Sequence, residues 1–197
     1  MRKVVFSTAL CALLNAPALA AADSWTIDPA HSSANFTIRH MMISNVKGSF
    51  GSVKGTVHYD GNNLKNASVD AEIAVDSVDT HNEKRDGHLK SPDFFDMAKF
   101  PAISFKSNKS TPTASGFDLG GDLTIHGVTK AVTLHVDKLS SPIKDPYGNE
   151  RIGTSAQTKI NRKDFGMKFN QQLDNGGVMV GDDVTVELDI EMTKNKE

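Results

Sequence analysis

Alternation of apolar and polar residues is the dominant pattern along this chain. In residues 67–75 every odd position is apolar and most even positions are polar, which predicts a β-strand with one apolar face. Residues 184–192 show the same pattern more cleanly, so a slip of one residue would turn the whole apolar set into water. Shorter runs of this kind occupy residues 34–40, 103–105, 117–119, 123–125 and 132–136. The chain therefore predicts at least seven strands.

Turn-forming residues separate these runs. Gly, Asn, Asp or Pro occur in residues 60–63, 120–121, 126–127, 145–149 and 174–177, where they favour tight reversals. The apolar phase also shifts by one position beside Gly51, which predicts a bulge or a sharp coil that helps a sheet to close. We expect a meander of antiparallel strands, and alternation alone leaves a sandwich and a closed barrel both open.

One stretch interrupts the alternation. Residues 82–89 are mostly charged, and Ser91, Pro92 and Asp93 have the composition of a helix start. We therefore expect short helices near residues 82–98, covering the strands.

The first twenty residues differ from the rest. Arg2 and Lys3 precede a mostly apolar run over residues 4–14, and residues 18–20 (Ala-Leu-Ala) match the pattern that a signal peptidase cleaves. We interpret residues 1–20 as a cleaved signal peptide and residues 21–197 as one domain exported to the periplasm. The apolar run is too short to span a membrane, as is every later one.

Composition narrows the classes of function. With 22 basic and 24 acidic residues and a net charge of −2, the chain has no basic excess for a nucleic-acid backbone. Cys11 is the only cysteine and lies within the predicted signal peptide. The mature domain would therefore contain neither a disulfide nor a cysteine nucleophile.

Seven segments carry a resemblance to a known family. They are residues 25–32 (WTIDPAHS), 36–40 (FTIRH), 48–55 (GSFGSVKG), 85–96 (RDGHLKSPDFFD), 100–105 (FPAISF), 121–129 (GDLTIHGVT) and 161–166 (NRKDFG). In order and spacing they resemble the YceI-type polyisoprenoid-binding proteins. The resemblance implies an all-β fold, namely an extended, lipocalin-like antiparallel barrel of eight strands. It also implies a lumen that holds a long isoprenoid or similar lipid, and often a homodimer.

A lumen for an isoprenoid chain needs only a dry, elongated, apolar lining, because the chain has no hydrogen-bonding groups. Met41, Met42 and Met97 are expected to add adaptable contacts. A solid core built from the same apolar side chains is the alternative. The candidate ligand-binding residues are Phe36, Ile38, His40, Phe50, Ile73, Val75, Arg85, His88, Ile103, Phe105, Phe117, Leu119, Leu123, Ile125, Phe165 and Met167.

Several polar residues allow other interpretations. His40, His81, Arg85 and His88 are the candidates for a periplasmic enzyme or a metal-dependent accessory of redox chemistry. The seven histidines show no metal-ligand spacing, however, so we expect no metal. The same group would also suit the phosphate or hydroxyl head of a lipid at the barrel mouth. A helix whose charged residues only pair with neighbouring backbone is the simplest interpretation.

Two further expectations concern structural residues. Within residues 161–166, Arg162 is expected to fork onto a carboxylate or onto carbonyls, and Gly166 to allow a bend. His126 and His135 are expected on solvated strand faces.

The sequence thus favours a non-enzymatic periplasmic lipid-binding protein, without catalytic residues or a cofactor other than the bound lipid. Its purpose would be transport, storage or protection against stress. An inner-membrane protein and a second copy of the chain are the candidate protein partners. A structural or signalling protein is a third possibility, which predicts a solid core and an exposed apolar patch.

Overall fold

The computed structural model describes residues 23–59, 64–174 and 176–196. The predicted signal peptide and the predicted turn at residues 60–63 lie outside the described residues. The strands are β1 (Ser24–Ile27), β2 (Ser33–His40), β3 (Ser44–Phe50), β4 (Val53–His58), β5 (Ser68–Ala74), β6 (Val78–Asp79), β7 (Ala102–Pro112), β8 (Gly116–Ile125), β9 (Val128–Asp137), β10 (Ile143–Lys144), β11 (Glu150–Asn161) and β12 (Val180–Lys194). The helices are α1 (Glu83–Lys90) and the short 3₁₀ turns η1 (Leu64–Asn66), η2 (Val75–Ser77) and η3 (Arg162–Phe165).

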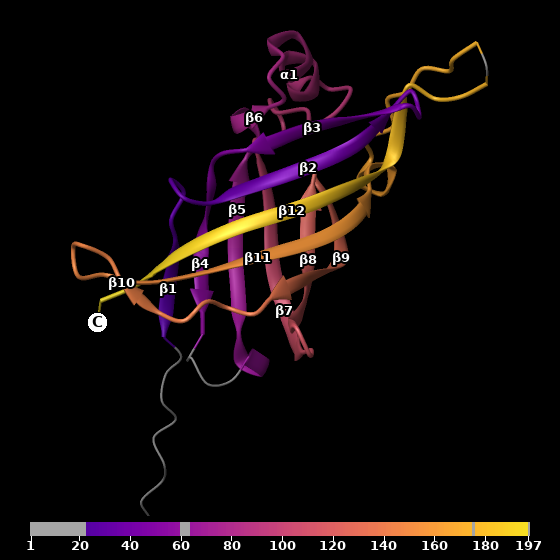
Figure 1. Cartoon of the computed structure of the whole chain (residues 1–197). Helices are drawn as coiled ribbons and strands as arrows, with labels where there is room; N and C mark the ends of the chain where they lie inside the picture. The colour runs from indigo at the N-terminus through magenta and orange to yellow at the C-terminus, as the bar shows by residue number, and fades with distance from the viewer. Residues whose placement is uncertain (1–22, 60–63, 175, 197) are drawn as a thin grey trace, which may run out of the picture.

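The strands form one antiparallel sheet that curls until β11 pairs with β12 and closes it (Figure 1). β1 and β2 follow one another along β12, while β4 pairs with β1 and β3 pairs with β2. β1 and β2 together therefore occupy one place in the wall, and β4 and β3 together occupy the next place, so the barrel is closed by eight strands. This confirms the predicted eight-stranded antiparallel barrel and excludes the sandwich.

The two most regular sequence patterns become strands in the predicted register. In β12 the apolar residues from Val184 to Met192 are buried or half-buried, whereas Thr185, Glu187 and Asp189 between them are exposed. β12 pairs with β11 over eleven residue pairs and with β2 along its first half. Its alternation therefore fixes which face of three neighbouring strands lines the barrel.

The predicted turn at Gly120 and Gly121 is wrong, and residues 117–119 and 123–125 belong to the single strand β8. A Cβ at Gly121 would lie 2.6 Å from the ring of Phe105, so the absence of a side chain leaves room for that ring. The two glycines face an irregularity in β7, where the register shifts between Ser107 and Lys109. Gly121 therefore serves close packing inside a strand, and neither glycine makes a reversal.

Only one of the helices expected near residues 82–98 forms. Asn82 caps α1 by accepting a hydrogen bond from the backbone N–H of Arg85 at 3.0 Å. Residues 92–95 are turns, and Ser91 ends α1 by donating from Oγ to the carbonyl of His88. Asp96 has a left-handed φ of 46°, which a continuing helix does not allow.

Other local expectations have mixed outcomes. The reversal at residues 126–127 joins β8 to β9, and the reversal at residues 145–149 joins β10 to β11. Gly51 and Ser52 interrupt the strand between β3 and β4, where a bulge or coil was predicted. His135 lies on the exposed face of β9, as predicted. His126 lies in a turn instead, with its ring 5.0 Å from that of Phe100.

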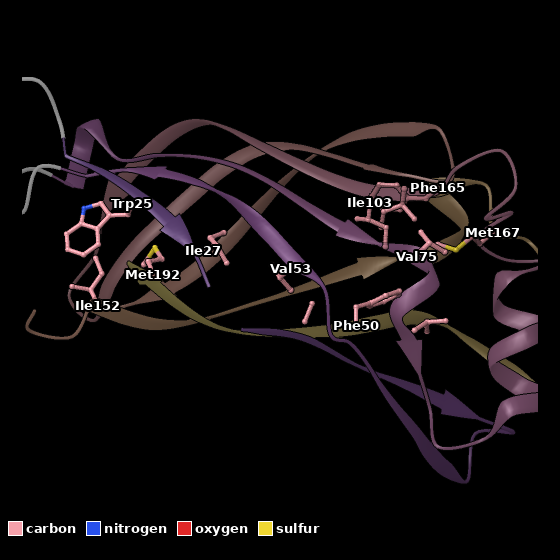
Figure 2. Close-up of a cluster of buried hydrophobic side chains, with 13 residues drawn as sticks. Trp25, Ile27, Phe50, Val53, Val75, Ile103, Ile152, Phe165, Met167 and Met192 are labelled. Atoms are coloured by element: carbon pink, nitrogen blue, oxygen red, sulfur yellow. The ribbon is translucent and has the colours of Figure 1, made fainter. Parts of the chain in front are cut away.

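One cluster of packed core side chains extends along the barrel, with Ile27 and Val53 between its two ends (Figure 2). Figure 2 shows Trp25, Ile152 and Met192 at one end, and Val75 and Phe165 near the other. Within the described ranges, no helix has both the length and the hydropathy needed to cross a membrane.

Candidate functional site

An apolar cavity of about 530 Å³ lies inside the barrel. Its wall comes from nearly every strand, because each strand turns its apolar face inward. The interior is therefore not a solid core. The predicted binding residues that line this cavity are Phe36, Ile38, His40, Phe50, Ile73, Arg85, His88, Ile103, Phe105, Phe117, Leu119, Leu123, Ile125 and Met167.

Val75 and Phe165 were predicted to line the lumen, and the structure places them in the packed core instead. Their exposed fractions are 1% and 2%, and both belong to 3₁₀ turns rather than to strands. Met97 packs against the same core. Met41 and Met42 are exposed at the turn between β2 and β3, so they do not provide the predicted lumen contacts.

Part of the wall was absent from the predicted set. Alternation in residues 184–192 indicates the contribution of β12, and six apolar side chains of that strand, including Val180, line the cavity. Phe94, Phe95 and Phe169 come from irregular segments that have no periodic signal. In β11 the inward residues include Thr154, Ala156 and Thr158, which are too small or polar to produce a clear apolar pattern.

Basic side chains gather at the end of the cavity near α1. Arg39, His40, Arg85, His88 and Arg162 all line it, and among the described residues no Asp or Glu does. Elsewhere the lining is almost wholly apolar. The cavity therefore combines a long hydrocarbon surface with a cationic end.

Arg85 and Asp86 bind the backbone and hydroxyl of one residue, Thr80. Arg85 donates from Nε to Thr80 Oγ1 and from Nη2 to the Thr80 carbonyl, both at 2.7 Å. Asp86 Oδ1 accepts from the Thr80 N–H at 3.0 Å and also from its hydroxyl. These contacts fix α1 to the end of β6, as the simplest interpretation of this helix predicts.

His88 is held by contacts on three sides. Its Nε2 lies 2.8 Å from Asp93 Oδ2, and its ring packs edge-on against Phe94 and Phe169. His81 precedes α1 and its side chain is 91% exposed, so it does not join the cavity. Asp86 binds Thr80, so the carboxylate that contacts His88 is that of Asp93.

Arg162 is the most deeply buried charge of this end, with an exposed fraction of 2%. It donates to the carbonyls of Gly181 at 2.8 Å and Met167 at 2.6 Å, as predicted for this residue. Burial lowers the pKa of its guanidinium, and the charge of Asp182 opposes that change. Gly166 follows with a left-handed φ of 81°, which provides the predicted bend.

The opposite end of the barrel carries an arginine with a different set of partners. Arg151 donates to Asp28 at 2.7 Å, to Asp145 at 2.9 Å and to Glu191. Hydrogen bonds from this guanidinium hold the pKa of Asp28 and of Asp145 well below their usual range.

Metal-ligating atoms of Asp28, His31 and Glu191 lie within 4.8 Å of one another at this same end. Arg151 donates to both carboxylates of this group and His31 lies 2.9 Å from Asp28. The geometry is that of an ion-pair network whose negative charge already has a cation.

Comparison with known proteins gives a consistent assignment. A family model described as the YceI-like domain matches residues 25–192. A UPF0312 protein of Staphylococcus aureus (strain N315) is 40% identical over 171 residues, which cover 86% of this chain and 97% of that protein.

Solved structures share the barrel. A YceI protein of Campylobacter jejuni is 32% identical, with a TM-score of 0.66, over 81% of this chain and 91% of that one. BcnA of Burkholderia cenocepacia has a TM-score of 0.72 at 21% identity, over 84% and 98% of the two chains. A polyisoprenoid-binding domain from Saccharophagus degradans has a TM-score of 0.64 at 16% identity, over 87% and 98%.

Proposed function

This chain belongs to the YceI-like domain family, and on that premise we propose that it is a non-enzymatic protein that binds a polyisoprenoid or isoprenoid-quinone type of lipid. The observation that carries the proposal is the apolar cavity of about 530 Å³ that runs inside the closed barrel. Each square ångström of hydrocarbon that leaves water for such a wall contributes about 25 cal/mol. A lipid chain therefore gains its affinity from length rather than from specific polar contacts.

The proposal includes an orientation of the lipid. Arg39, His40 and His88 lie at one end of the cavity, so a head group that accepts hydrogen bonds is expected there. The tail would extend toward Ile152 and Met192 at the far end. The fold-level relative from Saccharophagus degradans is described as polyisoprenoid-binding, which supports the same class of ligand.

We further propose export to the periplasm after removal of residues 1–20, with transport, storage or protection against stress as the purpose. N-terminal sequencing of the protein recovered from a periplasmic extract tests the export directly. A mature N-terminus at residue 21 is expected, and an intact Met1 in the cytoplasm would contradict it. A homodimer and an inner-membrane partner are proposals that sedimentation and crosslinking test.

Native mass spectrometry of the purified protein tests the lipid itself. We expect a mass adduct that organic extraction removes and that matches an isoprenoid-type lipid. Protein that carries no adduct, and that also retains no added polyprenol, would contradict the proposal.

A pair of variants in β12 tests where the lipid lies. Val186 faces the cavity midway along the barrel, opposite Phe36 and Thr158, whereas the neighbouring Thr185 is exposed on the outer face. Val186→Trp is expected to abolish retention of a polyprenol because the indole fills the lumen, and Thr185→Trp is the matched control that retains it. Retention by both variants would place the lipid outside the barrel.

A further inference from the structure

Most of the exposed large apolar side chains lie at one corner of the molecule. Met41 is 39% exposed, Met42 54% and Ile43 77%, and all three belong to the turn between β2 and β3. Val178, which is 36% exposed, lies on a second hairpin closed by a bridge between Gln172 and Val178. The N–H of Met41 donates to the carbonyl of Met179 at 2.7 Å, which joins the two hairpins. Figure 1 shows both at the same corner of the barrel, with the second hairpin extending further outward.

The turn holds its methionines in a conformation that they disfavour. Met41 and Met42 have φ values of 49° and 61°, and the N–H of Ile43 donates to the carbonyl of His40. Left-handed φ at both central residues is the pattern of a type I′ turn, where Asn and Gly fit best. Two large apolar residues at these positions conflict with the backbone preference of the turn and expose apolar surface to water. Neither feature stabilises the monomer, which points to a role in binding.

This corner adjoins the mouth of the cavity. Arg39 and His40 precede the turn, Met179 and Val180 follow the second hairpin, and all four line the cavity. A binding partner that covers the exposed turn would therefore also lie against the entrance to the lumen.

The charge of the β2–β3 hairpin indicates the chemistry of that partner. Residues 33–50 contain Arg39 and Lys47 but no Asp or Glu, in a chain whose net charge is −2. Arg39 donates to the Met42 carbonyl and to Asn45, and it makes no ion pair with any described residue. Apolar side chains at the tip of a hairpin, with unneutralised cations behind them, suit a membrane whose interior is apolar and whose head groups are anionic.

We propose that the β2–β3 turn inserts Met41, Met42 and Ile43 into a bilayer containing anionic phospholipid, which sets the mouth of the cavity against the membrane. The inference rests on the proposed function, since a lipid cargo has to pass between a bilayer and the lumen. Burial of the three side chains supplies the apolar part of the affinity, and Arg39 and Lys47 supply the part that depends on anionic lipid.

Flotation with vesicles of phosphatidylcholine, with and without phosphatidylglycerol, tests the proposal on the exported protein. The wild type is expected to float with the mixed vesicles, and a smaller fraction should float with phosphatidylcholine alone. High salt should lower the fraction that floats with the mixed vesicles. Met41→Asn combined with Met42→Gly is expected to lower the partition coefficient about tenfold. These residues suit a type I′ turn, so the melting temperature should be unchanged or higher, which excludes misfolding as the cause.

A control variant truncates two more fully exposed large side chains at the opposite end. Ile143→Ser combined with Tyr147→Ser truncates residues that are 64% and 88% exposed, and flotation should be unchanged. Equal loss in both variants, or no flotation of the wild type, would overturn the proposal. A dimer that dissociates in the turn variant, without vesicle binding, would assign the turn to a second copy instead.

Retention of a polyprenol added in detergent is measured in the same variants. Retained polyprenol without flotation overturns only the membrane contact. Loss of retention in the wild type would instead contradict the proposed function.

Discussion

The two ends of the barrel each hold arginines, but they satisfy them in opposite ways. At the end near Trp25, Arg151 is surrounded by the carboxylates of Asp28, Asp145 and Glu191. At the end near α1, Arg85 binds only Thr80, and the near neighbours of Arg39 are an amide and a carbonyl oxygen. The Trp25 end is neutralised. At the α1 end Arg162 pairs with Asp182 at 3.4 Å, whereas Arg39 and Arg85 make no ion pair with any described residue and keep their positive charge beside the apolar cavity.

The difference teaches how one side-chain type serves two purposes. A guanidinium matched by carboxylates connects β1, β11 and β12 near the point where the barrel closes. A guanidinium that is hydrogen-bonded only to neutral oxygens holds the backbone in place, and its positive charge stays uncompensated. The neutralised end is built for stability, and the charged end is suited to receiving a ligand.

The largest effect is expected from truncation at the Trp25 end. Trp25 is 3% exposed and its indole N–H donates to the carbonyl of Tyr59. Trp25→Ala should lower the free energy of unfolding by about 3–5 kcal/mol, because it leaves a large cavity in the packed end. Denaturant unfolding measures this, with Trp25→Phe as the milder control. A loss below about 1 kcal/mol would show that this end is not packed as described.

Removal of the buried arginine near α1 should have the next largest effect. Arg162→Leu leaves the carbonyls of Gly181 and Met167 without their donor, and we expect a loss of about 2–3 kcal/mol. Arg39→Leu, at an exposed position of the same end, is the control and should change stability little. Equal losses in the two variants would contradict the structural assignment of Arg162.

Acid should remove the stability that Arg151 contributes through its carboxylate partners. The pKa of Asp28 and Asp145 lies below the ordinary 3.8 in the folded protein, so both carboxylates stabilise the fold above pH 3.8 and lose this effect as pH falls further. Arg151→Met should therefore lower the melting temperature at pH 7, and the gap to the wild type should narrow as acid is added below pH 3.8. A gap that is independent of pH would indicate lost packing rather than lost charge pairing.

The smallest expected effect is the contribution of the lipid head group to binding affinity. Farnesyl phosphate and farnesol share one hydrocarbon chain, so their affinities differ only through the cationic end. We expect the phosphate to bind about tenfold more tightly, with the advantage reduced by salt and by Arg39→Gln. Competition against a fluorescent lipid measures both, and equal affinities would contradict a role of the positive charge in binding.

The sequence predicted those parts of the fold whose residues alternate strongly. β5 and β12 follow the predicted register because apolar residues occupy every second position and charged or hydroxyl residues lie between them. β11 was missed because its inward residues include Thr154, Ala156 and Thr158, so the two faces differ little in polarity. Gly120 and Gly121 were misassigned as a turn because the demand for a missing side chain at Gly121 comes from Phe105, on another strand.

The site was predicted in the same uneven way. Strand residues such as Phe36 and Leu119 line the cavity as the family resemblance implied. Phe94 and Phe169 reach it from irregular segments whose path depends on tertiary contacts, including those around His88. Local sequence contains no information on where such a segment returns to the barrel.

A crystal structure of the protein loaded with a polyprenyl phosphate tests the central claim most directly. Our account predicts one continuous stretch of ligand density inside the barrel, with the phosphate near Arg39 and His88 and the chain extending toward Met192. Density confined to the outer surface, with the lumen closed by its own side chains, would contradict it.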